Sequence, residues 1–268
     1  MSSPATVWSY RTLIVNLAQR ELKSRYKKSF LGWAWSLINP ATTLAIYSVV
    51  FGVFFGSQAP VAGNGHTTAF ALYLFCGLVT WNFFSGTVNT SIASFTTSGP
   101  LLTRTYFPPE CPVVAGMATV AIQASLELVI LLGFLVAVGN VAWTAVFVLP
   151  VFVLLACFAF GIGLVLGLGN IRYRDVNYLV GIGMQVVFYL TPIVYSLDNP
   201  SVAKHTTVVK LLKLNPMTSF VNAMRRSLWE LVPPTAVEWA VMSAWATVSL
   251  VGGWMIFSRY APRVIEEL

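Results

Sequence analysis

Charged side chains are scarce in this sequence. Lys, Arg, Asp and Glu make up 9% of the 268 residues, whereas 57% are hydrophobic, and the mean hydropathy is +0.75. Average soluble domains carry about 25% charged residues. A water-soluble domain of this composition would have too few charges to cover its surface, so the composition indicates an integral membrane protein.

Motifs for nucleotide binding, catalysis and metal binding are also absent. The sequence contains no G-x-x-x-x-G-K-[ST] phosphate loop, no H-E-x-x-H and no G-x-S-x-G. The three cysteines, Cys76, Cys111 and Cys157, are far apart and show neither zinc-ligand nor disulfide spacing. We expect Cys76 and Cys157, which fall in apolar stretches, to be packing residues. The sequence therefore predicts a chain that is not an enzyme and holds no metal or cofactor of its own.

Six apolar stretches are long enough to be considered membrane helices, because crossing a bilayer takes about 20 apolar residues. The fifth is short and contains Pro192. The predicted spans are residues 35–55, 69–93, 112–138, 143–168, 178–195 and 237–257. We predict one all-α membrane domain over residues 1–268, with a six-span bundle at 35–257 between a basic segment at 1–34 and a tail at 258–268.

The basic residues are distributed unevenly among the connecting segments. Five of them lie between Arg20 and Lys28, directly before the first span. Eleven Lys and Arg fall on the side that carries both termini and five on the other side. Because cytoplasmic segments are enriched in Lys and Arg, this distribution predicts a multi-pass protein of the bacterial cytoplasmic membrane with both termini in the cytoplasm. The placement beside apolar spans argues against nucleic acid as the reason for the net charge of +7 and favours anionic lipids as neighbours.

Two segments outside the spans have a pattern of their own. Residues 6–28 mix apolar and charged positions, which favours an amphipathic helix in the membrane interface; a disordered basic arm is the alternative. Residues 196–236 include an apolar stretch, 217–229, that is too short to span and contains Arg225 and Arg226. That stretch predicts short re-entrant or interfacial helices on the outer side.

A few polar residues fall inside the predicted spans. Glu127 lies midway in the third span, where a charge is costly, so it is either functional or a protonated carboxyl hydrogen-bonded to a neighbouring helix. Asn82, Ser85 and Asn89 follow a spacing of three and four, which places them on one helix face. That face predicts either helix–helix contact or a water-filled path. The glycines from Gly161 to Gly169 predict close helix packing rather than a phosphate site.

An ordered set of short motifs runs along the chain. The segment before the first span reads Arg20-Glu21-x-Lys23-x-Arg25-Tyr26-Lys27-x-Ser29-x-Leu31-Gly32-x-x-Trp35, followed by Pro40. Later landmarks are Gly99-Pro100-Leu101-Leu102 with Tyr106-Phe107-Pro108, then Arg172-Tyr173-Arg174-Asp175-Val176, Thr191-Pro192-Ile193-Val194-Tyr195 and Leu214-Asn215-Pro216. On a six-span frame, this set resembles the membrane subunit of type 2 ABC polysaccharide exporters. Glu21 stands where Asp is frequent in that family.

The resemblance implies a permease that pairs with a second copy of itself and with two copies of a separate ATPase, which would bind the ATP and Mg. It implies ATP-driven export of a lipid-linked polysaccharide, carried on polyprenyl diphosphate, from the cytoplasmic to the outer face. The cargo would be an O-antigen, a wall teichoic acid or a galactan.

The resemblance, together with residue chemistry, also suggests functional positions. Basic residues at the cytoplasmic interface would attract the lipid diphosphate, although topology alone also explains them; the candidates are Lys23, Arg25, Tyr26, Lys27 and Lys28. The 94–111 loop and the 172–175 turn would contact the ATPase, with candidates Leu101, Arg104, Tyr106, Phe107, Arg172, Arg174 and Asp175. The outer gate candidates are Asn215, Pro216, Arg225 and Arg226.

Aromatic rings are dense in the first two spans. Some would belong to the interfacial belt or to packing, and others would offer stacking surfaces to the sugar rings of a polymer. The candidates for the substrate path, aromatic and polar together, are Tyr47, Phe51, Phe54, Tyr73, Trp81, Asn82, Ser85, Asn89, Phe188 and Tyr189.

Three other functions remain alternatives. A drug or lipid exporter permease of the same ABC class would share the coupling loop without the signature around Arg25. An ATP-independent carrier or channel would be expected to show inverted repeats or several intramembrane ionisable groups. A membrane-embedded transferase would be expected to carry clustered acidic or His residues in its loops.

Overall fold

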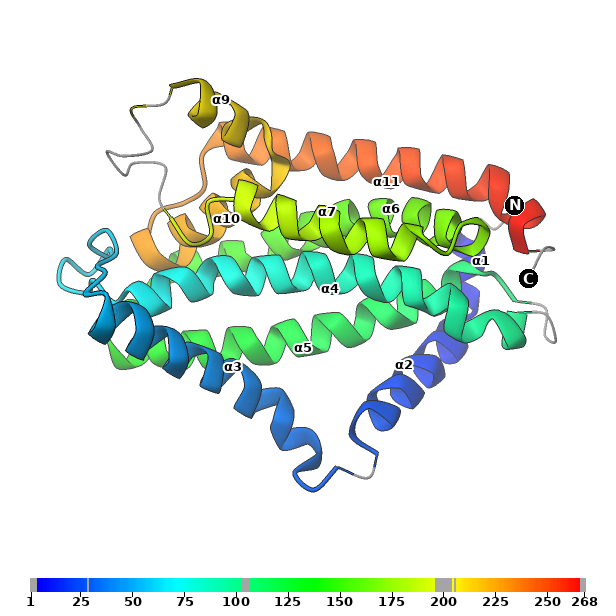
Figure 1. Ribbon diagram of the computed structural model, residues 1–268, viewed down its shortest axis with the longest axis horizontal. Helices are drawn as coiled ribbons and strands as arrows, with labels where there is room; N and C mark the ends of the chain where they lie inside the picture. The colour runs from blue at the N-terminus through cyan, green and yellow to red at the C-terminus, as the bar shows by residue number, and fades with distance from the viewer. Residues whose placement is uncertain (1–3, 28, 103–106, 196–203, 205, 266–268) are drawn as a thin grey trace.

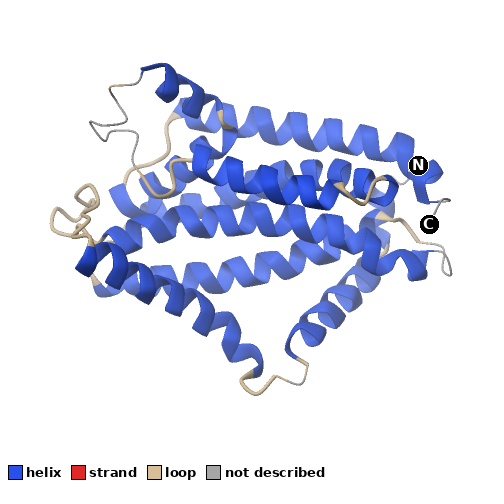
Figure 2. Cartoon of the chain, in the orientation of Figure 1, coloured by secondary structure: helices blue, strands red, loops and turns tan. Residues whose placement is uncertain are grey.

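The computed structural model describes residues 4–27, 29–102, 107–195, 204 and 206–265. These residues are almost entirely helical (Figure 2), and the extended backbone they contain is an isolated bridge between Gln58 and Ala69. Long helices lie side by side along the longest axis of the molecule (Figure 1). We call the end that carries α1 (Pro4–Ser9) the inner end, and the end that carries the 56–68 loop the outer end.

Helix α4 (Phe70–Leu102) is the centre of the bundle. It packs against α5 (Glu110–Ala137) and α6 (Val148–Arg172), and α11 (Ala236–Ile265) packs along α6. In the most apolar window of α4, 83% of the residues are buried, against 22–39% in α5, in α6 with its preceding turn, and in α11. The apolar faces of α5, α6 and α11 that point away from α4 therefore remain on the surface, as expected for helices in contact with lipid.

Small residues let α6 approach its neighbours closely. A Cβ atom on Gly161 would lie 2.1 Å from the backbone oxygen of Ser249 in α11, and one on Gly253 would lie 2.3 Å from the backbone oxygen of Gly161. A Cβ atom on Gly163 would lie 2.4 Å from the Ser91 hydroxyl of α4, and one on Gly167 would lie 2.6 Å from the Phe95 ring of α4. The prediction that these glycines serve helix packing is confirmed. The cysteines are free, with Cys76 and Cys111 buried and Cys157 partly buried.

The N-terminal third is less tightly packed. Helix α2 (Arg11–Tyr26) packs on α5, and the chain then continues through η1 (Gly32–Ala34), α3 (Trp35–Tyr47) and the π-helical turn η2 (Ser48–Phe54). In the span made by residues 32–54 only 11% of the window is buried. The end of α2 and the start of α3 lie away from the bundle (Figure 1). This part of the chain therefore exposes a long apolar surface.

The outer segment contains short helices. After α6 the chain returns through α7 (Val176–Leu190) to the outer end, where α9 (Thr206–Leu214), α10 (Pro216–Arg225) and η4 (Arg226–Glu230) precede α11. A further turn, η3 (Trp143–Phe147), precedes α6. Most of α10 and η4 is buried against α4, α6 and α11. Short helices were predicted here; a gating role stays a prediction.

Five of the six predicted spans correspond to helices that are long and apolar enough to cross a membrane. The exception is α7, whose 15 residues give a length of about 22 Å, less than the roughly 30 Å of a bilayer core. A sixth crossing therefore stays a prediction. The start of α1 and the end of α11 do lie at the same end of the bundle (Figure 1).

One expectation near the inner end needs correction, and another is not confirmed. Helix α4 runs to Leu102, so the first half of the predicted 94–111 loop is helical. The reason is that Phe95 is fully buried against Phe257, which extends the packed core beyond residue 93. Helices α1 and α2 confirm helical structure in the N-terminal segment, but Trp8 and Val15 are exposed and only Ala18 is buried among the described side chains. The predicted amphipathic character is not confirmed.

Candidate functional site

The central helix exposes one polar face. Between Phe70 and Thr97 of α4, the exposed positions are Asn82, Asn89, Ala93, Thr96 and Thr97. Their spacing places them along one side of the helix. Large apolar side chains are missing from this set, although most of α4 is apolar. We call these five residues the α4 polar stripe; Ser85, also predicted for this face, is half-buried beside it.

The stripe is joined to α5 through the one acidic residue in the middle of that helix. The Nδ2 atom of Asn82 donates a hydrogen bond of 3.1 Å to Oε2 of Glu127, whose side chain is buried. One turn earlier, Gln123 donates to the backbone oxygen of Ser36 in the first span. The structure therefore places Glu127 in a hydrogen-bonded contact between helices, beside the exposed face of α4.

The predicted path aromatics separate into two groups. Phe54 and Tyr189 are exposed, while Tyr47, Phe51 and Phe188 are half-buried. Tyr73 and Trp81 are buried, because Tyr73 packs edge-on against Trp229 and Trp81 packs edge-on against Phe188. Contrary to the expectation of an accessible stacking surface, Tyr73 and Trp81 lie in the core of this subunit.

The predicted outer gate residues differ in their burial and in their hydrogen-bond partners. Arg225 is 3% exposed, and its guanidinium donates hydrogen bonds to the backbone oxygens of Pro192 and Ile193. Burial lowers the pKa of Arg225 from its ordinary value, and the neighbouring Tyr73 acts in the opposite direction. Asn215 caps α10 by accepting a hydrogen bond from the backbone N–H of Met217, and Pro216 occupies the first turn. Asn215 also donates a hydrogen bond to the Thr191 hydroxyl. Asn215 and Arg225 therefore both bind residues that directly follow α7.

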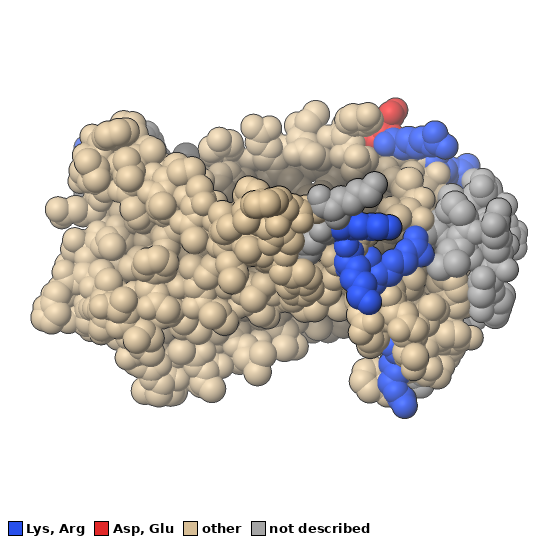
Figure 3. Space-filling model, turned by 90° about the horizontal axis from the view of Figure 1, so that it is seen from below, with Lys and Arg blue, Asp and Glu red and all other residues tan. Residues whose placement is uncertain are grey.

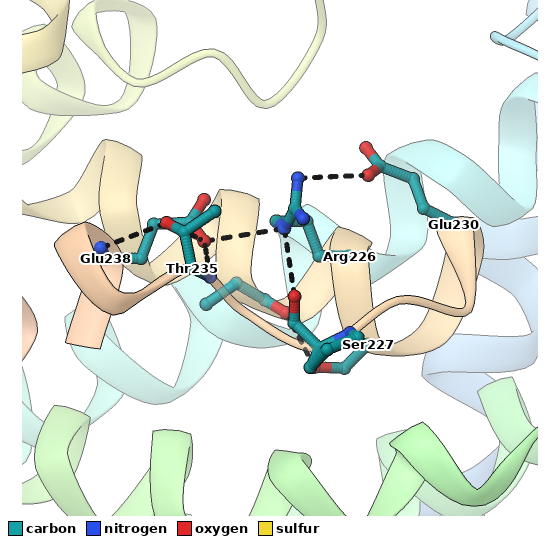
Figure 4. A network of polar contacts seen from close by, with 7 residues as sticks. Arg226, Ser227, Glu230, Thr235 and Glu238 are labelled. Carbon is teal, nitrogen blue, oxygen red and sulfur yellow. Dashed lines mark hydrogen bonds and ion pairs between the residues drawn. The ribbon is translucent and has the colours of Figure 1, made fainter.

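Arg226 is the centre of a second, more exposed network (Figure 4). It lies 3.6 Å from a carboxylate oxygen of Glu230 and 3.5 Å from one of Glu238, and it donates to the backbone oxygen of Pro233. Thr235 and Glu238 exchange hydrogen bonds in a capping box that begins α11. The network fixes the turn between η4 and α11.

At the inner end, three of the predicted coupling residues lie on one exposed turn. Arg172, Arg174 and Asp175 are exposed on the turn after α6, and the Arg172 guanidinium lies over the ring of Tyr173. Phe107 is buried, Leu101 lies in the last turn of α4, and Arg104 and Tyr106 lie outside the described residues.

Asn170 connects this turn to α4, and sequence reasoning missed it. Its side chain donates to Thr96 at 3.5 Å and accepts a hydrogen bond from the backbone N–H of Asn177 at 3.2 Å. The contact with Thr96 joins residues 74 positions apart, so an asparagine near the end of an apolar run gives no signal for it.

The predicted basic entry residues lie in the last turn of α2 and directly after it. Lys23 and Lys27 are exposed, the side chains of Arg25 and Tyr26 are not among those described, and Lys28 lies outside the described residues. On the face seen in Figure 3, Lys and Arg gather towards the inner end. In the described part of the chain, His, Cys, Asp and Glu form no group of three that could hold a metal ion.

The sequence matches the family described as ABC-2 type transporter over residues 12–229. The chain belongs to the ABC-2 type transporter family. It is 30% identical over 262 residues to the O-antigen export system permease protein RfbA of Myxococcus xanthus, covering 96% of this chain and 94% of that protein. It is 27% identical over 190 residues to a protein of the same name from Klebsiella pneumoniae, covering 69% and 70% of the two chains.

Membership of the ABC-2 family is consistent with the lack of a phosphate loop in the sequence. Permeases of this family work with an ABC ATPase, so the permease chain itself needs no nucleotide-binding motif. The matched region includes α2, the α4 polar stripe, the 172–175 turn and α10. It therefore covers the candidate path, coupling and outer residues together.

Proposed function

We propose that this ABC-2 permease exports a polysaccharide across the cytoplasmic membrane of a bacterium, with both termini in the cytoplasm. Two copies would form the path, and two copies of a separate ATPase would bind ATP and Mg and drive transport. The full-length similarity to a permease named for O-antigen export supports this cargo class over a drug. A teichoic acid or galactan cargo has no such support.

The observation that carries the proposal is the α4 polar stripe. Polar side chains on a membrane helix are costly when they face lipid, so they normally face protein or water. Two exposed asparagines on the most buried helix offer donors and acceptors to a hydroxyl-rich polymer. Exposed Phe54 and Tyr189 would supply stacking surfaces at other points along the path.

The inner and outer ends of the subunit would have different roles in export. The cargo would be lipid-linked, and Lys23 in the last turn of α2 and Lys27 directly after it would attract its diphosphate end at the inner side. The ATPase would contact the segment after α4 and the exposed turn at Arg174 and Asp175. The α9–α10 segment would form the outer gate, with Arg225 and Asn215 holding it to α7.

The test is depletion of the permease in the source organism, followed by locating the lipid-linked surface polymer. We expect the polymer to accumulate on the cytoplasmic face, and its composition to identify the cargo. Normal surface polymer after depletion, without a second permease gene to explain it, would contradict polysaccharide export and favour the drug or lipid exporter of the same class.

Complementation with point variants tests the path. Asn89→Leu should fail to restore export although the protein is present at its normal level, because the polar surface of α4 is interrupted. Ser125→Leu is the matched control: Ser125 is also exposed, on α5, and bonds to its own helix. Equal export by the two variants would rule out the stripe as a path and leave helix–helix contact as its role.

A further inference from the structure

A pocket with a volume of about 260 Å³ lies between α2, α4 and α5. Helix α2 contributes Arg20, Glu21 and Ser24 to its lining, and α4 contributes Thr90, Ser94 and Thr97. On α4 these residues follow a spacing of four and three, and on α2 Arg20 and Glu21 lie four and three positions before Ser24, so each helix presents one face. Arg20, Ser24 and Thr97 are exposed, so the pocket opens to the surface.

The pocket lining combines one cation, one carboxylate and several hydroxyls. The Oγ atom of Ser94 donates 2.7 Å to the backbone oxygen of Thr90, and Oγ of Ser24 donates 2.8 Å to that of Glu21. Both serine oxygens therefore keep lone pairs for an incoming donor. Glu21 is held towards α5, where Oε1 lies 3.5 Å from the Thr119 hydroxyl.

The charges and hydroxyls of this lining indicate what kind of ligand the pocket can bind. The guanidinium of Arg20 matches a phosphate, which it can bind through two parallel N–H groups. The carboxylate of Glu21 would repel an isolated phosphate but accepts hydrogen bonds from hydroxyl groups. A polar occupant can add hydrogen bonds to the groups of this lining, which an apolar occupant cannot.

We propose that the pocket binds a lipid headgroup in which a phosphate ester is joined to a hydroxyl-bearing group. Its volume lies near the roughly 300 Å³ lower limit of small-molecule pockets, which suits a headgroup and not a polymer. The pocket continues into the α4 polar stripe, because Thr97 belongs to both and Ala93, another stripe residue, also lines the pocket. A role as the first docking place of the cargo rests on the proposed function, whereas headgroup binding does not.

Two sources share this chemistry: the phosphate–sugar end of a glycolipid and the glycerophosphate headgroup of a phospholipid. The purified full-length permease in detergent is titrated by calorimetry with glucose 1-phosphate, with dihexanoylphosphatidylglycerol, and with inorganic phosphate and dihexanoylphosphatidylcholine as comparison ligands. We expect saturable binding of at least one of the first two, at least tenfold tighter than both comparison ligands. Tighter binding of the sugar phosphate assigns the pocket to cargo, and tighter binding of phosphatidylglycerol assigns it to membrane lipid.

Variants link this binding to the pocket. Arg20→Gln should weaken binding at least tenfold, and Thr97→Leu should weaken it by filling the pocket. The controls are Arg11→Gln, an exposed arginine elsewhere on α2, and Thr247→Leu, an exposed threonine on α11. Both should change binding less than twofold. Size-exclusion profiles and thermal unfolding establish that each variant is folded.

Three results would overturn the proposal. If inorganic phosphate bound as tightly as the headgroup ligands, the pocket would not recognise hydroxyl groups. If the Arg11 and Arg20 variants lost binding equally, the effect would be general charge attraction. If no ligand bound saturably, the pocket would not be a binding site. None of them bears on where polymer accumulates after depletion, so the headgroup site and the export function can fail separately.

Discussion

The guanidinium carbon of Arg225 lies 3.8 Å from the centre of the Tyr73 ring. The same guanidinium donates to the backbone oxygens of Pro192 and Ile193, which follow α7. One side chain of α10 thus joins the central helix to the far end of α7. Because Val180 is the one buried residue of α7, the helix depends on such contacts at its ends for its position.

The two adjacent arginines should therefore differ in their effect on stability. Arg225→Met removes a cation–π contact and leaves two buried carbonyl oxygens without their donors, and we expect a loss of about 3 kcal/mol in the free energy of unfolding. Arg226→Met is the matched control, because its ion pairs are partly exposed and such pairs contribute about 1 kcal/mol or less. Thermal unfolding of the two variants in the same detergent measures the difference. Similar melting temperatures would contradict a fastening role for Arg225.

Glu127 should matter as a hydrogen-bond acceptor more than as a charge. Glu127→Leu removes the hydrogen bond from Asn82 at a partly buried contact, at a cost of about 0.5–1.5 kcal/mol. Glu127→Gln keeps a carbonyl oxygen that can accept from Asn82, so we expect it to retain most of the stability. Thermal unfolding again makes the comparison. If the Gln variant were as unstable as the Leu variant, the carboxylate itself would be required.

Sequence reasoning located the helices and one polar face of α4 because both follow local periodicity. Long apolar runs predicted six spans, of which five correspond to helices of spanning length, and the spacing of Asn82 and Asn89 placed both on one side of α4, which the structure shows to be exposed. Hydropathy cannot tell lipid-facing from core-facing apolar residues, since both surroundings are apolar. For that reason Trp81 and Phe54 looked alike in the sequence, although Trp81 is buried and Phe54 is 76% exposed.

Contacts between distant segments could not be read from the sequence. The carbonyl partners of Arg225 lie 33 and 32 residues earlier in the chain. The family resemblance placed Arg225 among the outer gate residues, but its partners are backbone groups that every sequence contains, so no sequence signal indicated them. The pocket at Arg20 likewise depends on three helices meeting, and the sequence showed only a basic cluster beside a span.

The exposed turn at the inner end should affect coupling without affecting folding. Arg174 is exposed, and Asn170 fixes the turn from outside it, so Arg174→Ala should leave the melting temperature unchanged. In the complex with its ATPase, we expect the variant to lower transport-coupled ATP hydrolysis several-fold. Arg259→Ala, another exposed arginine at the inner end, is the control. A loss of expressed protein equal to the loss of coupled activity would point to folding instead.

The close crossing of α6 and α11 gives the most direct test of the fold. A methyl group added at Gly161 would overlap the backbone of Ser249, which cannot move aside as a flexible side chain can. We therefore expect Gly161→Ala to separate the two helices and to cost about 1–3 kcal/mol, as overpacking does elsewhere. Gly181→Ala on α7 is the matched control, since nothing lies within 4 Å of its added methyl group. Alanine is the better helix former by about 1 kcal/mol, so the control variant should melt at the same or a higher temperature. Thermal unfolding in one detergent compares the two, and a Gly161→Ala protein as stable as the Gly181→Ala protein would show that α6 and α11 do not cross this closely.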